Sequence, residues 1–470
     1  MIVVRANETG ARGDGRSDDR PALQAAVDRA AAAGGGTVVL PTGMRCRTGT
    51  LRLSSRVELH LERGSSLVAS DRAADYPSAD RPVLLEARDA EEVVVAGRGT
   101  LEGHSRDFMA RHLGYIWEPS PFRPGLLQFV GCRGVRLEGV TFHDSAFWTV
   151  HLVGCERVDV LDVVVDNGLD VPNCDGIVPD RCRDVRIHGC RIRCADDAIV
   201  LKTGGEHPGL GPAEDIRVSD CELMCTASAI KLGSGTAGDF RNLSFRDCSV
   251  RSSSRGLVIQ LRDQGSVENL VFSGFQIETR LFDPHYWGHA EPIQVTAVPR
   301  TMAQADGRRP PWNPEARLGT VSGVRFADIE ARGEGGIVLY GCPQSVLRDI
   351  ELDSVRVRID KRSRWPGGYL DLRPIDLGGS DVWVEPARDP GRIPRKIPGI
   401  LARCVSGLRL RDVAVERGAG PLEYLGEALE LEQADGVAID GFTARGVPTG
   451  GGTAGSERSG AWQVRRRIAG

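Results

Sequence analysis

The sequence lacks the features that would point to a membrane protein or a nucleic-acid-binding protein. It contains no run of eighteen apolar residues, so we expect no membrane-spanning helix. The formal net charge of the 470 residues is -4, so neither sign dominates, and we expect neither a nucleic acid nor a membrane as a partner. The first residues, MIVVRANETGARGDG, contain no apolar core of a signal peptide, so the sequence predicts a cytoplasmic protein.

Several common catalytic signatures are also missing. There is no Ser/His/Asp order, no HExxH pair and no Walker-type glycine loop. The glycine-rich stretches at Gly13 and Gly34 do not lead from a strand into a phosphate-binding helix, so they are interpreted as turn and cap glycines. We therefore expect no cofactor and no bound metal.

The sequence does contain a short repeat. A small or polar residue followed by an aliphatic-x-aliphatic triplet recurs along most of the chain. The first aliphatic residues of these triplets are Val135, Val158, Val185, Ile216, Leu243, Leu270, Val324, Ile350, Leu408 and Val437. The first five steps are 23, 27, 31, 27 and 27 residues, and the sixth is 54, which we interpret as two steps.

Each repeat unit is predicted to consist of short strands joined by turns. The turns are rich in Gly, Asp and Asn, and no unit carries a ten-residue helical pattern between its strands. Strands with a side-chain period of two cannot bury their apolar side alone and must stack on the next unit. The predicted fold class is therefore all-β, a parallel β-solenoid over residues 1–450, followed by a C-terminal tail at 451–470.

One position tests this alignment of the units. The fifth residue after each triplet marker stays apolar over seven units: Val140, Val163, Cys190, Cys221, Cys248, Phe275 and Ile329. We interpret the three cysteines as small core residues rather than metal ligands, because a straight column with rungs about 4.8 Å apart offers no tetrahedral enclosure. Free buried cysteines fit a reducing compartment.

Other segments depart from the repeat. Residues 18–34 are predicted to form a capping helix, with Asp18 or Asp19 before Pro21, an Ala-rich run, and a stop at the glycines that begin with Gly34. Three irregular segments, at 107–124, 281–315 and 361–395, interrupt the units. Insertions in a solenoid project from one side, so we expect these three to wall a binding groove.

Three acids are the main candidates for catalysis. Asp175 lies in the stretch NCDG, and Asp196 and Asp197 lie in ADDA, about one turn of the coil later. Stacked rungs would bring the carboxylates onto one face, and a separation of roughly 6.5–9.5 Å suits inverting glycoside hydrolysis. Negative charges at so short a distance raise the pKa of one carboxyl, which then stays protonated and can act as the general acid. The alternative interpretation is an ordinary Asx turn and a charged corner.

The ordered set resembles glycoside hydrolase family 28, the polygalacturonase family of right-handed parallel β-helices. Its members carry Asn-Thr-Asp, Asp-Asp, Gly-His-Gly and Arg-Ile-Lys on successive turns, and Asn173-Cys174-Asp175 and Asp196-Asp197 match the first two. The resemblance covers roughly residues 6–298. It implies a single-stranded right-handed β-helix in which Asp196 protonates the leaving oxygen. Asp175 and Asp197 would hold and deprotonate the attacking water.

Two later motifs of the family are altered. The position of Gly-His-Gly holds ASA, so Ser228 replaces the histidine, and the position of Arg-Ile-Lys holds VIQ, from Val258 to Gln260. The two cations with which the family binds a galacturonate carboxylate are therefore missing, which argues against ordinary polygalacturonate as the substrate. Nearby cations that could compensate are Lys231, Arg255 and Arg262.

Further residues are candidates for substrate binding. The full predicted set is Asn173, Lys202, Ser228, Lys231, Gln260, Arg255, Arg262, Tyr286, Trp287 and Glu291. Tyr286 and Trp287 either stack on a sugar or pack within their loop, and Glu291 either binds a sugar hydroxyl or forms a structural salt bridge. Trp365 and Tyr369 are weaker candidates of the same kind. His143 and His151 are interpreted as structural.

The sequence thus predicts an inverting, exo-acting glycoside hydrolase that acts on pectin-type or related oligosaccharides. It predicts a monomer or a homo-oligomer and leaves transglycosylation open. A β-helical polysaccharide lyase, with Ca²⁺ held by carboxylates and a Lys or Arg base, is one alternative. A non-catalytic carbohydrate-binding β-helix is another.

Overall fold

The structure is a computed structural model that describes residues 2–77, 81–299, 318–372, 392–446 and 466–467. Its contacts divide the chain into two compact units. The first unit comprises residues 1–202 and 209–225, and the second comprises 203–208 and the described residues from 226 onward. The predicted boundary at residue 450 falls outside the described residues. No helix in the described ranges is long and apolar enough to cross a membrane.

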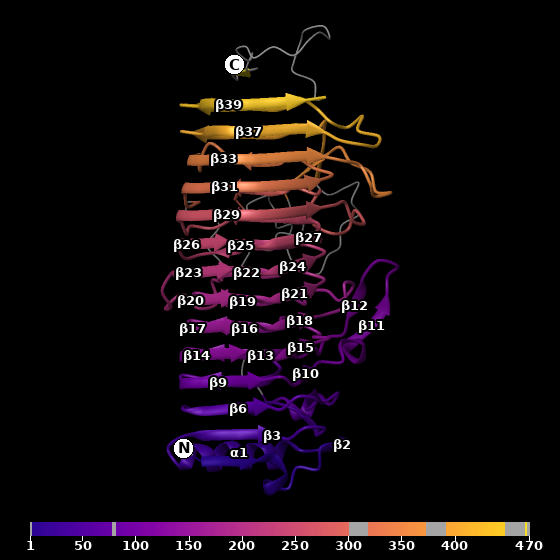
Figure 1. Ribbon diagram of the computed structural model, residues 1–470, viewed down its shortest axis with the longest axis vertical. Coiled ribbons are helices and arrows are strands. Elements are labelled where there is room, and N and C mark those ends of the chain that lie inside the picture. The colour runs from indigo at the N-terminus through magenta and orange to yellow at the C-terminus, as the bar shows by residue number, and fades with distance from the viewer. Residues whose placement is uncertain (1, 78–80, 300–317, 373–391, 447–465, 468–470) are drawn as a thin grey trace, which may run out of the picture. The chain divides into compact units, whose positions relative to one another are not determined.

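The first unit consists of three parallel sheets whose strands stack as successive rungs, as Figure 1 shows for β6, β9, β14, β17 and β20. The first sheet contains β1 (Ile2–Arg5), β3 (Gly36–Leu40), β6 (Val57–Leu61), β9 (Glu91–Gly97), β14 (Arg133–Glu138), β17 (Glu156–Leu161), β20 (Arg183–His188) and β23 (Ala213–Ser219). The second sheet contains β2 (Asp14–Asp18), β4 (Arg45–Thr48), β7 (Ser66–Ala69), β10 (Thr100–Glu102), β15 (Thr141–His143), β18 (Val164–Asp166), β21 (Arg191–Cys194) and β24 (Glu222–Cys225). The third sheet contains β5 (Leu51–Arg52), β8 (Val83–Arg88), β13 (Gly125–Val130), β16 (Val150–Val153), β19 (Ile177–Asp180) and β22 (Ile199–Thr203).

The register of the first sheet confirms the repeat that was inferred from the sequence. Val135, Val158, Val185 and Ile216 lie opposite one another on successive strands, and all four are buried. Cys190 and Cys221 are also buried, and neither forms a disulfide. Burying each inward-facing aliphatic side chain contributes about 1.5–3 kcal/mol to stability, which makes the stacking of rungs favourable.

The predicted capping helix is α1 (Arg20–Ala32), slightly shorter than the predicted range 18–34, and it lies beside β3 at the N-terminal end of the unit (Figure 1). It buries Leu23, Ala26, Val27 and Ala30. Asp19 occupies the N-cap position, but its carboxylate accepts hydrogen bonds from the backbone N–H groups of residues 12 and 13 instead of capping the helix. The carboxylate therefore anchors the preceding loop.

The second unit repeats the same architecture with longer strands. Within this unit, five long strands each take the place of a first-sheet strand and the second-sheet strand that follows it: β29 (Val267–Thr279), β31 (Val321–Gly333), β33 (Leu347–Ile359), β37 (Arg409–Arg417) and β39 (Ala438–Arg445). Two shorter strands pair with the halves of β29: β26 (Phe240–Arg246) and β27 (Ser249–Ser253). The third sheet contains β25 (Ser228–Thr236), β28 (Arg255–Leu261), β30 (Ile293–Ala297), β32 (Ile337–Tyr340), β36 (Ile400–Ser406), β38 (Leu429–Asp435) and β40 (Arg466–Arg467). The last of these lies within the predicted tail, whose other residues are outside the described ranges.

One step of the repeat was interpreted wrongly. Leu270 lies directly opposite Val324, so the 54-residue step is a single rung and not two. The extra residues lie in the connections on either side of β30, which separates β29 from β31, and the hydrogen bonding between strands does not depend on the length of these connections. The aromatic core continues across this rung, because the ring of Phe272 stacks on those of Phe245 and Phe326 at centroid distances of 4.6 and 5.0 Å.

Each of the three predicted insertions begins in the turn between a second-sheet strand and a third-sheet strand, but the predicted segment 281–315 is wrong in part, because it contains strand β30 (Ile293–Ala297). Residues 107–124 follow β10 and η3 (Ser105–Phe108) and form an antiparallel hairpin of β11 (Met109–His112) and β12 (Trp117–Pro119) before β13. In the second unit, residues 281–292 precede β30, and β34 (Tyr369–Asp371) and β35 (Arg392–Pro394) precede β36. The remainder of the predicted insertions, 300–315 and 373–391, lies outside the described residues.

Candidate active site

The three predicted catalytic acids lie in the same turn of two successive rungs of the first unit. Asp175 lies in the turn between β18 and β19, and Asp196 and Asp197 lie in the turn between β21 and β22. The backbone ladder continues through these turns, because the N–H of Gly176 donates to the carbonyl of Asp197 at 2.9 Å. A Cβ at Gly176 would lie 2.3 Å from the carbonyl oxygen of Ala198, so only glycine permits this close approach.

The register refines the predicted one-turn spacing. Ile177 lies opposite Ile199, so each residue of this rung matches the one 22 positions later. Asp175 is therefore stacked with Asp197, and Asp196 lies beside that column. The sequence-based step of 21 residues placed Asp196 in the column instead, because the lengths of the two turns could not be compared without the hydrogen bonds.

The three carboxylates converge. One oxygen of each lies within 4.8 Å of the others. Asp175 and Asp197 are each 2% exposed, whereas Asp196 is half-buried and is the most accessible of the three. The nearest oxygens are closer than the roughly 6.5–9.5 Å expected between the carboxyls of a general inverting site, so the spacing alone does not decide the stereochemical course.

Neighbouring polar groups position these acids. Asn173 has a left-handed backbone (φ 55°), which asparagine tolerates, and its Nδ2 lies 3.5 Å from Asp196 Oδ2. Arg123, at the end of the first insertion, donates to Asn173 Oδ1 at 2.8 Å and to the carbonyl of Pro172 at 2.9 Å. The Lys202 ammonium lies 3.7 Å from Asp175 Oδ2 and stabilises that carboxylate by Coulomb attraction.

The same three carboxylates are suited to a cation. Among the residues that the structure describes, they form the one group of three or more His, Cys, Asp or Glu side chains whose ligand atoms come this close together. Three carboxylate oxygens are ligands that hard divalent cations accept. The geometry therefore permits a divalent ion as well as acid–base chemistry.

Four residues beside the acids were not identified as candidates from the sequence. The rings of Phe147 and Trp148 stack at 5.3 Å, Arg81 lies over both rings, and Arg123 lies over Phe147. The stretch SAFW was noted only for its flanking histidines. Continuing the register of β16 back from Val150 would have placed Trp148 on the rung next to Asp175.

In the second unit, two of the altered family positions each lie opposite one of the candidate cations. Lys231 lies opposite Val258, and Ser228 lies opposite Arg255. Ser228, Val258 and Gln260 are buried, and the Lys231 ammonium lies 5.7 Å from the centroid of Trp287. The predicted substrate contacts of these residues stay predictions.

Arg255 belongs to a buried ionic cluster. Its guanidinium, 1% exposed, lies 3.6 Å from Glu291 and 3.1 Å from Asp371. The N–H of His289 donates to Glu291 at 2.7 Å, and the N–H of Gly288 donates to Asp371 at 2.5 Å. Burial raises the pKa of Glu291 to about 7, although the charge of Arg255 opposes this shift. Glu291 was predicted either to bind a sugar hydroxyl or to form a structural salt bridge, and the structure shows the salt bridge, with Arg255.

The remaining candidates mostly contact loops. Arg262 donates to Thr296 Oγ1 at 3.1 Å and to the carbonyl of Leu372 at 3.0 Å, so it joins β30 to the last insertion. The ring of Tyr286 packs against Phe282. Trp365 stacks under Arg364, and Tyr369 stacks under Arg392.

The two histidines that were interpreted as structural have different surroundings. His143 is exposed and lies 3.6 Å from Asp166. His151 is buried, and its Nδ1 lies 3.1 Å from Gln128 Nε2. Neither contact involves the three catalytic candidates.

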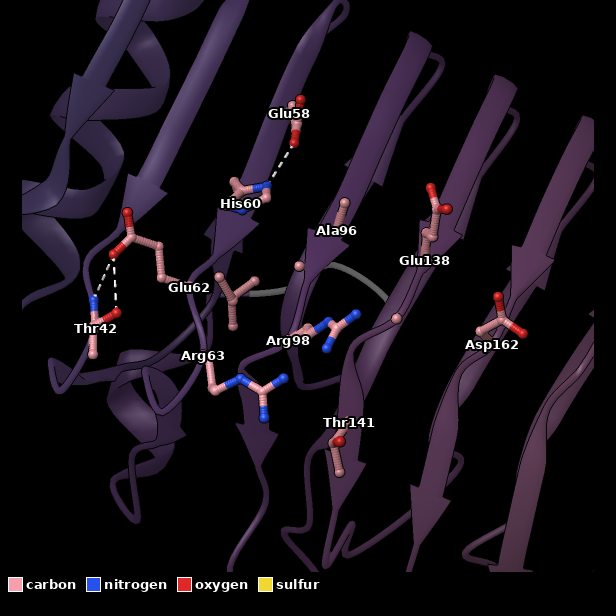
Figure 2. Close-up of a pocket in the computed structure, with 13 residues that line it drawn as sticks. Thr42, Glu58, His60, Glu62, Arg63, Ala96, Arg98, Glu138, Thr141 and Asp162 are labelled. Atoms are coloured by element: carbon pink, nitrogen blue, oxygen red, sulfur yellow. Dashed lines mark hydrogen bonds and ion pairs between the residues drawn. The ribbon is translucent and has the colours of Figure 1, made fainter.

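A separate cleft of about 1100 Å³ lies on the outer surface of the first unit and crosses β6, β9 and β14. Figure 2 shows Glu58, His60, Arg98, Glu138 and Asp162 around it. Its carboxylates are largely paired, for example Glu58 with His60 at 2.9 Å. Since its lining contains no converging acids and no Phe, Tyr or Trp side chain, we do not assign it as the active site.

Comparisons with known proteins agree with this geometry. The sequence matches the model of the glycosyl hydrolases family 28 over residues 37–279, just over half of the chain. A probable polygalacturonase of Vitis vinifera is 26% identical over 396 residues, which cover 78% of this chain and 77% of that protein.

Two solved structures share the fold. The family 28 exopolygalacturonase of Yersinia enterocolitica has a TM-score of 0.69 at 15% identity and covers 93% of this chain and 78% of its own. The hyperthermoactive exopolygalacturonase of Thermotoga maritima has a TM-score of 0.63 at 23% identity, with coverages of 76% and 87%. The predicted right-handed parallel β-helix is thus confirmed. The chain belongs to the glycosyl hydrolases family 28.

Proposed function

We propose that the protein is an inverting glycoside hydrolase that removes sugars from the ends of pectin-type or related oligosaccharides. The observation that carries this proposal is the convergence of three carboxylates within 4.8 Å in one turn of the β-helix. Membership of a glycosidase family supports a carbohydrate substrate. Ordinary polygalacturonate is not the proposed substrate, because Val258 and Gln260 occupy the positions of the family's two cations.

The proposed chemistry divides the three acids into two roles. Asp196 is the most accessible, and it donates its proton to the leaving glycosidic oxygen. Asp175 and Asp197, stacked on adjacent rungs, hold a water and accept its proton as it attacks the anomeric carbon from the opposite face. Repulsion among three close carboxylates favours one shared proton, and Lys202 directs that proton away from Asp175.

The exo mode is supported by the insertions. The first insertion forms a hairpin and delivers Arg123 to the acid-bearing turn, where it fixes Asn173. A wall on one side of a groove limits how far a chain extends past the acids. The exopolygalacturonases among the similar structures agree with this mode.

The test is a screen of pectic, rhamnogalacturonan and neutral oligosaccharides with purified protein, with the product anomer followed by NMR. We expect the first product signal to have the anomeric configuration opposite to that of the substrate. The decisive variant is Asp196→Asn, which should lower the rate about 10²–10⁴-fold without changing the circular dichroism spectrum. Undiminished turnover by this variant would remove the assignment.

A second candidate function rests on the ability of the same acids to hold a cation. A polysaccharide lyase would use Ca²⁺ at Asp175, Asp196 and Asp197 and a neighbouring base such as Lys202. Its activity would disappear on chelation and would give an unsaturated product that absorbs ultraviolet light. Glycan binding without any new reducing ends would instead support a carbohydrate-binding protein.

The compartment is also a proposal. None of the twelve cysteines, all of which lie in the described ranges, forms a disulfide, and eleven of them are buried. Chains with many unpaired cysteines fit a reducing compartment such as the cytoplasm, where short imported oligosaccharides would be the substrate. Fractionation of the native source cell would test this, and recovery in the culture medium would contradict it.

A further inference from the structure

An aromatic pair lies directly beside the catalytic acids. Thr149 donates its backbone N–H to the carbonyl of Asp175 at 2.9 Å, and Val150 pairs with Ile177. This register places Trp148 opposite Asp175, one rung or about 4.8 Å away. The ring of Phe147 stacks on that of Trp148 with an angle of 14° between the planes. Both rings are half-buried, so they form a fixed surface at the edge of the acid cluster.

Three cations from three different segments lie over these two rings. The guanidinium carbon of Arg81 is 4.7 Å from the centroid of Trp148 and 5.4 Å from that of Phe147. The guanidinium of Arg123 is 4.6 Å from the Phe147 centroid, and the ammonium of Lys202 is 4.9 Å from the Trp148 centroid. Contacts of this kind hold a cation in place through the ring's negative face and do not neutralise its charge.

The three cations differ in their other contacts. Lys202 is paired with Asp175, and Arg123 is bonded to Asn173 and to the carbonyl of residue 172. Arg81 forms neither a hydrogen bond nor an ion pair with any residue in the described ranges. On the rung between those of Arg81 and Trp148, Gly125 lies opposite Val83 on one side and Trp148 on the other, so this position adds no side chain. Arg81 therefore presents a half-buried, oriented guanidinium with available donors.

We propose that Arg81 and Arg123, held on Phe147 and Trp148, form a subsite that binds the carboxylate of a uronic acid residue next to the scissile bond. A planar guanidinium fork matches a carboxylate with two parallel hydrogen bonds. The charge at this position suits a uronate, because its carboxylate would contact the guanidinium groups and would lie about one rung from Asp175. This inference rests on the proposed hydrolase function and specifies its substrate class.

The subsite gives a consistent account of the altered family motif. The family's two cations for a carboxylate are replaced by Val258 and Gln260, which are buried. A substrate that carries its carboxylate on the Arg81 side of the cleaved bond does not need those cations. The substrate class that follows is an oligosaccharide with a uronic acid on one side of the scissile bond and a neutral sugar on the other.

The test compares Arg81→Gln with Arg217→Gln, which removes the same charge from an exposed position on β23. Each variant is assayed on an acidic oligosaccharide from the substrate screen and on its carboxyl-reduced form. We expect Arg81→Gln to raise KM for the acidic substrate about ten- to a hundredfold and to leave kcat nearly unchanged. The kinetic constants of this variant for the carboxyl-reduced substrate should stay near those of the wild type. Arg217→Gln should alter the kinetic constants for neither substrate. Arg81→Lys should restore only part of the affinity, because an ammonium lacks the fork.

A binding measurement separates this inference from the proposed function. Binding of galacturonate is measured by titration calorimetry with the full-length wild-type protein and with the Arg81→Gln variant. If no variant hydrolyses any glycoside but galacturonate binding depends on Arg81, the proposed function is wrong and the subsite is supported. If the wild type hydrolyses acidic substrates and Arg81→Gln is equally efficient, the subsite is wrong and the proposed function stands. Absent or Arg81-independent galacturonate binding also overturns the subsite.

Discussion

The two units of this protein each contain a cluster of charged side chains, and the balance of charge differs between them. In the first unit, Asp175, Asp196 and Asp197 repel one another, and Lys202 pairs with only one of them, at 3.7 Å. In the second unit, the charges attract. The guanidinium of Arg255 lies between two buried carboxylates at 3.6 and 3.1 Å, and backbone N–H groups complete the cluster.

This difference is the one we expect between the proposed catalytic site and a structural ionic cluster. Repelling groups cost folding free energy, and they persist because the stacked rungs fix their positions from outside. A closed cluster such as that of Arg255 contributes to the fold only while each partner is present, since a single remaining buried charge is expensive.

The largest effect is expected on catalysis in the first unit. Asp197→Asn should lower kcat about 10²–10⁴-fold, because it removes one acceptor of the water proton. The free energy of unfolding should stay equal or rise, because the change removes a like charge from the cluster. Kinetics and urea unfolding of the same preparation measure both, and a large loss of stability would place Asp197 with the structural charges.

The opposite result is expected in the second unit. Arg255→Met should lower the free energy of unfolding by about 3–5 kcal/mol, because it removes the cation that lies between the buried carboxylates of Glu291 and Asp371. Urea unfolding measures the loss. A variant of wild-type stability with a raised KM would instead support the sequence-based prediction that Arg255 binds substrate.

Glu291 should make stability depend on pH. Folding raises its pKa from 4.5 to about 7, so between these values the folded state binds a proton that the unfolded state has released. The stabilisation is complete below pH 4.5 and is lost as the pH rises from there through 7, by an amount on the order of 3 kcal/mol. Urea unfolding between pH 5 and 8 should show this loss, and Glu291→Gln should flatten the profile relative to wild type.

The smallest effect is expected at the outer cleft. Arg98→Gln removes an exposed guanidinium from that cleft, and it should change kcat/KM by less than about twofold and stability by less than about 0.5 kcal/mol. Arg81→Gln provides the contrast, since the same chemical change is made beside the acids. A loss of activity in Arg98→Gln would make the outer cleft a second substrate site.

The elements that could be predicted from sequence are those set by side-chain periodicity. The column of Val135, Val158, Val185 and Ile216 was located correctly, because alternating apolar residues must face the interior of any such coil. The acid-bearing turns followed from the same markers. The arginines over Phe147 and Trp148 did not follow, because Arg81 and Arg123 come from turns whose lengths and directions carry no periodic signal.

The amino-acid sequence is enough to predict that the chain coils into stacked rungs and that three acids share one type of turn, because a two-residue period and recurrent turn residues act locally. The identity of the neighbours across rungs follows from the tertiary structure. That structure paired Asp175 with Asp197, made a 54-residue step a single rung, and enclosed Arg255 between two carboxylates. Such contacts depend on inter-strand hydrogen bonds, which fix register irrespective of how many residues the intervening loop contains.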